Sequence, residues 1–390
     1  MNIARNRGLA GIAALSALAL GLTACSSDTK DDETTKASET TSAADSTTSA
    51  ADTTTEAPSA PGLVKGTGTL NGSGASSQVN AQQAWRDTFT AGTGVVVNYD
   101  ATGSGTGREQ FIAGKVSYAG TDSILKPEEV TAATERCGGK EPMELPLYIS
   151  PIAVAFNLEG IENLNMTADV IAKIFDGKIT KWNDAAIADL NKDVTLPDLD
   201  IIPVNRADDS GTTENFQEFL VEAAGDSWGY EPSDVWPRTG TQSAEKTSGV
   251  VNLVNSTPGA VTYADASQIG NLGTAAVEVS GEFVKYSPEA AAAIVDGSAA
   301  TSDATDLRLT VELKRDGSIK GAYPVVMISY LVACTEYKDA NDATNVKNFL
   351  TYVASNEGQT AATVAKGGNA PISDALRTKV MAAVDQIKTN

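Results

Sequence analysis

The chain has 390 residues, a formal net charge of −21 and no histidine. The lack of His excludes His-based general base catalysis and His metal ligation. Lys and Arg form no stripe, so the composition argues against nucleic acid as a partner. An acidic chain of this kind binds a small anion only through a local, preorganised site.

The N-terminal segment has the pattern of a secretory signal. Two arginines precede an apolar run at 8–22, which is shorter than the roughly 20 residues that span a bilayer. The run ends in Leu-Thr-Ala-Cys, which resembles a bacterial lipobox; a plain signal peptide with an incidental Cys is the alternative. We therefore expect a lipoprotein signal peptide at 1–24, lipidation of Cys25, and an anchor at the extracytoplasmic face of the cell membrane.

The next segment, 25–65, is rich in Ser, Thr and acidic residues and poor in large apolar ones. Such a segment cannot bury enough apolar surface to offset its ordering entropy. We expect a disordered tether, and stalks of this composition can carry glycans. The remaining chain is long enough for two domains.

A repeated pattern of strand, small-residue turn and helix begins after the tether. Apolar segments at 66–70, 95–99 and 118–120 read as strands, and helical spacing of apolar residues follows the first two. This alternation predicts an α/β protein with a mainly parallel sheet, whose ligands lie beyond the carboxyl ends of the strands. The three turns at these strand ends contain Ser76 and Ser77, Ser104, and Asp122.

A fourth turn, at 205–213, follows the apolar run 201–204 and precedes a helix with apolar residues at 216, 219 and 220. Ser210 or Thr212 can cap this helix, and Gly211 allows close approach to the backbone. Unpartnered amides at the helix start favour an anion, and Arg206 adds a forked positive charge. An ordinary capped helix with a nearby ion pair is the alternative.

Two long apolar runs, at 144–157 and 323–334, predict strands that cross between lobes. Lobe I would then consist of 66–147 together with 328–390, and lobe II of 148–327. Two lobes joined by two strands form a hinge with a cleft.

Three cysteines are present, and Cys25 is the one that we expect to carry the lipid. The other two, Cys137 and Cys334, are expected to form a disulfide, since paired cysteines are commoner than catalytic ones in exported proteins. Such a bond would link the two parts of lobe I near the crossovers.

The polar groups of the four turns are mainly neutral donors, which suit a small oxyanion. Asp122 differs, because a carboxylate repels an anion unless the ligand carries a proton to donate. Phosphate carries one near neutral pH and sulfate does not. A missing charge-assisted hydrogen bond costs several kcal/mol, roughly 10³-fold in affinity. The alternative is that Asp122 caps the turn at 123–130.

Five segments occur in an order that resembles the phosphate-binding subunit of a phosphate-specific ABC transporter. The most specific are Phe-Asp-Gly-Lys-Ile-Thr-Lys-Trp-Asn at 175–183 and Arg-Ala-Asp-Asp-Ser-Gly-Thr at 206–212; the others lie at 72–76, 103–107 and 119–122. The resemblance covers most of 66–390. It implies a two-lobed α/β binding protein of the periplasmic type (type II) that closes on phosphate and delivers it to a membrane permease.

The resemblance also assigns roles by position. It implies that phosphate is held by Ser76, the Ser77 amide, Ser104, Arg206, Ser210, Gly211 and Thr212, with Asp122 accepting the ligand's proton and Asp208 orienting Arg206. The sequence departs from the family twice. Ser77 stands where an aromatic is frequent, and Asp209 stands where Gly is frequent, so the Asp209 carboxylate must point to solvent.

Three other functions compete with phosphate binding. The first is a binding protein for another oxyanion, such as sulfate or molybdate. Asp122 argues against it, because the carboxylate would repel an anion that carries no proton. A phosphatase with a Ser nucleophile would need a base, and no His, neighbouring Lys or acidic metal cluster supplies one. A structural lipoprotein without a ligand would not need repeated anion-suited turns. We therefore expect a binding protein with no catalytic residue, metal or cofactor.

Overall fold

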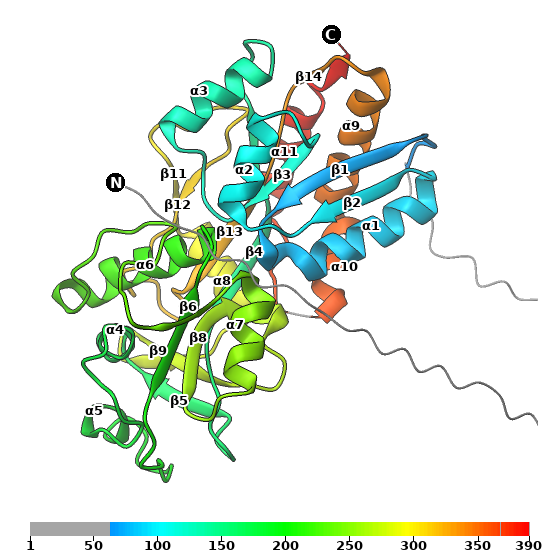
Figure 1. The fold of residues 1–390 in the computed structure, drawn as a ribbon. Helices are drawn as coiled ribbons and strands as arrows, with labels where there is room; N and C mark the ends of the chain where they lie inside the picture. Colours follow the sequence, from blue (N-terminus) through cyan, green and yellow to red (C-terminus); the bar gives the residue numbers. More distant parts are fainter. Residues whose placement is uncertain (1–62, 367, 390) are drawn as a thin grey trace, which may run out of the picture. The chain divides into compact units, whose positions relative to one another are not determined.

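The computed structural model describes residues 63–389 except 367 (Figure 1). The expected signal peptide at 1–24, Cys25 and almost all of the expected tether at 25–65 lie outside the described residues.

An eleven-stranded sheet runs through the described part of the chain. Its main order is β2-β1-β3-β13-β4-β8-β6-β7, and β9 joins it by pairing with β4, β5 and β10. The small pairs β11-β12 and β14-β15 lie apart from it. The strands are β1 (Thr69–Gly74), β2 (Val96–Asp100), β3 (Tyr118–Thr121), β4 (Met143–Phe156), β5 (Asn163–Met166), β6 (Ile202–Arg206), β7 (Gln242–Ala244), β8 (Ala260–Asp265), β9 (Gly273–Val279), β10 (Glu282–Val284), β11 (Ala299–Ala300), β12 (Val311–Glu312), β13 (Val326–Ala333), β14 (Glu336–Tyr337) and β15 (Lys388–Thr389).

Helices alternate with these strands. Among the described residues, none is long and apolar enough to cross a bilayer. They are η1 (Ser76–Gln78), α1 (Val79–Thr93), α2 (Ser104–Ile112), α3 (Pro127–Arg136), α4 (Ala168–Phe175), α5 (Ala185–Ala188), α6 (Gly211–Ala224), η2 (Gly225–Ser227), α7 (Lys246–Asn255), η3 (Ala266–Gln268), α8 (Pro288–Asp296), α9 (Ala340–Ala354), α10 (Asn356–Lys366) and α11 (Asp374–Val384).

We call β1–β3 with α1–α3 and α9–α11 the first half, and β5–β10 with α4, α6 and α7 the second half. In the first half α2 packs on β1 and β3, and the C-terminal helices α9 and α10 pack on α1 (Figure 1). In the second half α7 packs on β6 and β8, and α4 packs on α6. Neighbouring segments far apart in sequence therefore build each half.

The prediction of a mainly parallel sheet is correct within each half and wrong at the centre. β1 is parallel to β2 and β3, and β6 is parallel to β7 and β8. The central pairs β3-β13, β13-β4 and β4-β8 are antiparallel. The reason is that β13 returns from the second half and lies between β3 and β4, antiparallel to both, although β4 follows β3 through α3.

All residues of β4 and β13 are buried, as the two apolar runs predicted for central strands. Their register shifts between Ser329 and Tyr330, which pair with Tyr148 and Pro146, so Leu147 is the extra residue of a bulge. Pro146 has no N–H to donate to a neighbouring strand, and a β-bulge is a place where a central strand tolerates proline. The carbonyl of Leu147 instead accepts a hydrogen bond from a buried Gln359 side chain at 3.0 Å.

The expected Cys137–Cys334 disulfide is present, with Cα atoms 5.4 Å apart. Cys137 ends α3 and Cys334 follows β13, so the bond fastens this helix to a central strand across 197 residues of sequence. The boundaries of the two lobes remain a prediction.

One buried carboxylate lies where the second half meets β4. Asp265 ends β8, is fully buried, and accepts hydrogen bonds from the Tyr148 hydroxyl at 2.9 Å and the Ser267 amide at 3.0 Å. Burial raises its pKa to about 6, although hydrogen bonds from Ser267, Ser150 and Tyr148 oppose the rise. Its pKa in the unfolded chain is about 3.9, so the fold binds the proton more tightly than the unfolded chain does.

Asp265 should therefore contribute stability at low pH that is lost as the pH rises through about 4 to 6. Between pH 5 and pH 7 the wild-type free energy of unfolding should lose about 1 kcal/mol that Asp265→Asn does not lose. Urea unfolding at both pH values measures this difference, with the exposed Asp193→Asn as control. Equal pH dependence of the wild type and Asp265→Asn would contradict it.

Candidate anion-binding site

Four turns at strand carboxyl ends carry the candidate site. Ser76 begins η1 after β1, Ser104 begins α2 after β2, and Asp122 follows β3. Ser210 precedes α6 after β6 of the second half. All of these side chains are buried, although they come from both halves of the sheet.

The Asp122 carboxylate lies at the centre of these turns. Oδ1 accepts hydrogen bonds from the hydroxyls of Ser77 at 2.7 Å and Ser329 at 2.6 Å. Oδ2 accepts one from the Thr212 hydroxyl at 2.8 Å. Asp122 therefore does not cap the following turn, where Lys126 is the N-cap residue of α3.

The backbone of Asp122 joins two more elements. Its N–H donates to Ser104 Oγ at 3.1 Å, and its carbonyl accepts from Asn215 Nδ2 at 2.7 Å. Ser104 belongs to the first half and Asn215 to α6 of the second. The predicted residues Ser104, Asp122 and Thr212 thus meet at one place.

The Arg206 guanidinium is held by a carboxylate from its own turn. Its Nε donates to Asp208 Oδ1 at 2.7 Å and its Nη2 to Oδ2, a bidentate pair. Burial would raise the pKa of Asp208, but the Arg206 hydrogen bonds and charge, with the Lys246 amide at 2.9 Å, lower it below its usual value. Within the described part of the chain, Arg206 Nη1 makes no hydrogen bond to a protein group. The geometry therefore fixes the guanidinium plane and leaves one edge to donate.

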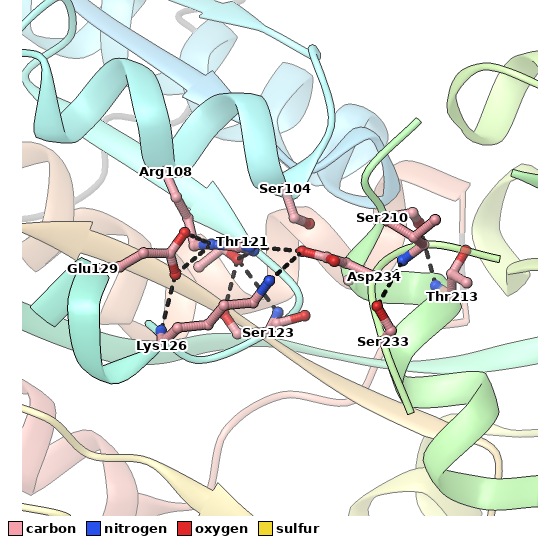
Figure 2. Close-up of polar contacts among 12 residues, drawn as sticks. Ser104, Arg108, Thr121, Ser123, Lys126, Glu129, Ser210, Thr213, Ser233 and Asp234 are labelled. Atoms are coloured by element: carbon pink, nitrogen blue, oxygen red, sulfur yellow. Dashed lines mark hydrogen bonds and ion pairs between the residues drawn. The ribbon is translucent and has the colours of Figure 1, made fainter. Parts of the chain in front are cut away.

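The turn before α6 divides its roles among three residues. Ser210 Oγ accepts from the Thr213 amide at 3.2 Å and so caps the helix (Figure 2). Gly211 fits closely, because a Cβ built there would lie 2.8 Å from both Asp122 Cβ and the Ser123 amide nitrogen. Thr212, the other candidate cap, contacts Asp122 instead.

Ser76 contacts a residue that the sequence did not indicate. Ser76 Oγ accepts from the Thr247 amide at 3.0 Å, and the two hydroxyl oxygens lie 3.1 Å apart. Thr247 is buried in the first turn of α7, after the short β7, whose residues are not buried. A strand of three such residues gives little pattern, so the turn after it carried no signal.

The sequence did not indicate two other residues that contact Asp122. Ser329 lies inside an apolar run that reads only as a strand, and Asn215 lies on a helix face that reads only as packing. The Ser77 hydroxyl was also missed, because the resemblance pointed to its amide. Asp209 is exposed as expected, and its carbonyl accepts from the Gly105 amide at 3.3 Å.

Comparison with known proteins places this chain in a family. A family model of the PBP superfamily domain matches residues 33–357. Phosphate-binding protein PstS 3 of Mycobacterium tuberculosis is 33% identical over 320 residues, which cover 81% of this chain and 85% of the relative. PstS 2 of the same organism is 31% identical over 322 residues, covering 81% and 86%.

Among solved structures, a high-affinity periplasmic phosphate-binding protein with bound phosphate is similar in fold. Its TM-score is 0.66 at 22% identity, covering 80% of this chain and 93% of that one. The chain therefore belongs to the PstS phosphate-binding proteins of the PBP superfamily. The predicted two-lobed, periplasmic-binding-protein-like α/β fold class is confirmed, and these relatives are transport binding proteins rather than enzymes.

The contact of Gly211 with Asp122 gives a stability prediction. Gly211→Ala should lower the free energy of unfolding by about 1–3 kcal/mol, because the new methyl group overlaps Asp122 and the backbone of Ser123. Gly229→Ala, where a Cβ meets nothing within 4 Å, should change it by less than about 0.5 kcal/mol. Urea unfolding measures both variants, and equal effects would show that the turn does not pack against Asp122 as described.

Proposed function

We propose that this protein is an extracytoplasmic solute-binding lipoprotein that binds inorganic phosphate in a cleft between its two lobes and delivers it to an ABC permease. A lipid on Cys25 would anchor it at the outer face of the cell membrane. The observation that carries the proposal is the convergence of Ser104, Thr212 and the Asp122 carboxylate from separate strand ends. Membership of the PstS family supports it.

Each candidate residue has a role that its chemistry suits. Arg206, held by Asp208, supplies the charged donor, and the starts of η1, α2 and α6 supply hydroxyls and amides. The hydroxyl and amide donors are those of Ser76, Ser77, Ser104, Ser210, Gly211 and Thr212.

Asp122 would select the ligand by its proton. A carboxylate that faces an anion accepts a hydrogen bond only where the anion still carries hydrogen, as phosphate and arsenate do near neutral pH. Sulfate has no such proton and would meet like charge in a buried place. A binding protein for sulfate or molybdate is the second candidate, and no contact among the described residues favours it.

Calorimetric titration with phosphate, arsenate and sulfate tests both the function and the role of Asp122. The wild type should bind phosphate and arsenate, and sulfate should not displace phosphate. Asp122→Asn should reduce the ratio of phosphate affinity to sulfate affinity by about 100-fold or more, because the Asn amide can donate a hydrogen bond to a fully ionised oxyanion such as sulfate. Asp209→Asn removes an exposed carboxylate of the same turn and should leave the ratio unchanged within about threefold. Equal binding of sulfate and phosphate by the wild type would overturn the proposal.

Arg206→Ala should weaken phosphate binding by about 100-fold or more, because it removes the buried charge-assisted donors. Arg238→Ala is the matched control: its guanidinium lies in the same half, tied to Asp176 and the Phe175 carbonyl. It should cost less than about threefold. Calorimetry on both variants measures the difference, and near wild-type affinity of Arg206→Ala would place the charged contact elsewhere.

A further inference from the structure

A buried acidic side chain outside the candidate site links the two halves of the molecule. Asp234 lies in the segment between η2 and β7 and is 5% exposed. Its carbonyl accepts from the Ser210 amide at 2.9 Å. The neighbouring Ser233 carbonyl accepts from Gln217 of α6 at 2.6 Å. These contacts fasten the segment to the start of α6 in the second half.

The Asp234 side chain makes its ion pairs with the first half. Its Oδ2 lies 3.0 Å from Arg108 Nη2 on α2 and 3.0 Å from Lys126 Nζ at the start of α3 (Figure 2). The Arg108 side chain is 1% exposed, so this pair is shielded from solvent, whereas Lys126 is half-exposed. Buried pairs are screened by salt far less than surface pairs.

Arg108 is also held by partners from its own half. Its Nε donates to both Glu129 oxygens at 2.9 and 3.0 Å, and its Nη1 donates to Thr121 Oγ1 at 3.2 Å. These partners belong to α3 and β3 of the first half. They hold the guanidinium in an orientation in which it can bind a carboxylate from the second half. Burial would raise the pKa of Asp234, but the hydrogen bonds and charges of Lys126 and Arg108 lower it below its usual value.

Among the described residues, the other polar contacts between the halves are hydrogen bonds and not ion pairs. Thr212 to Asp122, the Thr247 amide to Ser76 and the Gly105 amide to Asp209 are single hydrogen bonds at or beside the candidate site. A ligand that enters the site competes for some of these groups. The Asp234 pairs lie outside the set of groups that would touch the ligand, and they form only when the two halves are together.

We infer that Asp234 is a positioning residue that latches the closed state through Arg108 and Lys126, and so sets how slowly bound phosphate leaves. The inference rests on the proposed phosphate binding. Because the Ser210 amide is bonded to the Asp234 carbonyl, the latch also keeps the start of α6 facing α2, which begins at Ser104. Opening the halves would break a buried ion pair and leave Arg108 with Glu129 alone as a charged partner.

The test compares Asp234→Asn with Asp226→Asn in the full-length chain. Asp226 lies in η2 of the same half, is exposed, and makes no ion pair among the described residues, so it controls for the loss of one negative charge. Stopped-flow measurements should show phosphate leaving Asp234→Asn about tenfold faster or more, with the association rate changed by less than about threefold. The ratio of phosphate to sulfate affinity should stay at the wild-type value, since Asp122 is intact. Asp226→Asn should match the wild type in every rate.

Amide hydrogen exchange without phosphate gives a second readout. The Gly105 and Thr247 amides each donate across the two halves and neither contacts Asp234, so their exchange reports closure. Both should exchange faster in Asp234→Asn than in the wild type or in Asp226→Asn.

Unchanged exchange in Asp234→Asn would overturn the latch, and so would faster exchange with an unchanged phosphate release rate. A changed ratio of phosphate to sulfate affinity would also overturn it, because Asp234 would then act on the site itself. If the wild type binds no phosphate, the proposed function fails, while the exchange measurement still decides whether Asp234 holds the halves together.

Discussion

The hydrogen bonds that end on the Asp122 carboxylate hold the centre of this structure. A buried carboxylate needs donors, and here they come from η1 (Ser77), the central strand β13 (Ser329) and the start of α6 (Thr212). Satisfying one side chain therefore fixes where three separate elements lie. The same arrangement brings the turns of both halves together, so the fold and the candidate site share one constraint.

The central strands connect this constraint to the rest of the sheet. β4 and β13 pair with each other and with strands of both halves, and their bulge lies at Leu147, opposite the step from Ser329 to Tyr330. The disulfide at the end of β13 and the buried Asp265 next to β4 hold the same region. Ser329 of β13 donates to Asp122, so these strands also contact the group that is proposed to recognise the ligand's proton.

Much of this could be predicted from the sequence because it depends on local patterns. The strand-turn-helix units that position Ser76, Ser104 and Ser210 follow from apolar periodicity and small residues, and the central strands follow from long apolar runs. The contacts of Thr247 and Asp234 could not, because each is defined by a partner more than 100 residues away and lies near a short strand or in a loop. The antiparallel centre was missed for the same reason, since pairing across the halves leaves no mark in either strand alone.

A crystal structure of the protein grown with phosphate would show whether Asp122 contacts the ligand. We expect one phosphate oxygen within hydrogen-bond distance of the Asp122 carboxylate, with other oxygens facing the Arg206 guanidinium and the start of α6. A phosphate bound away from Asp122, or a carboxylate turned from the ligand with its three hydroxyl partners unchanged, would contradict this expectation.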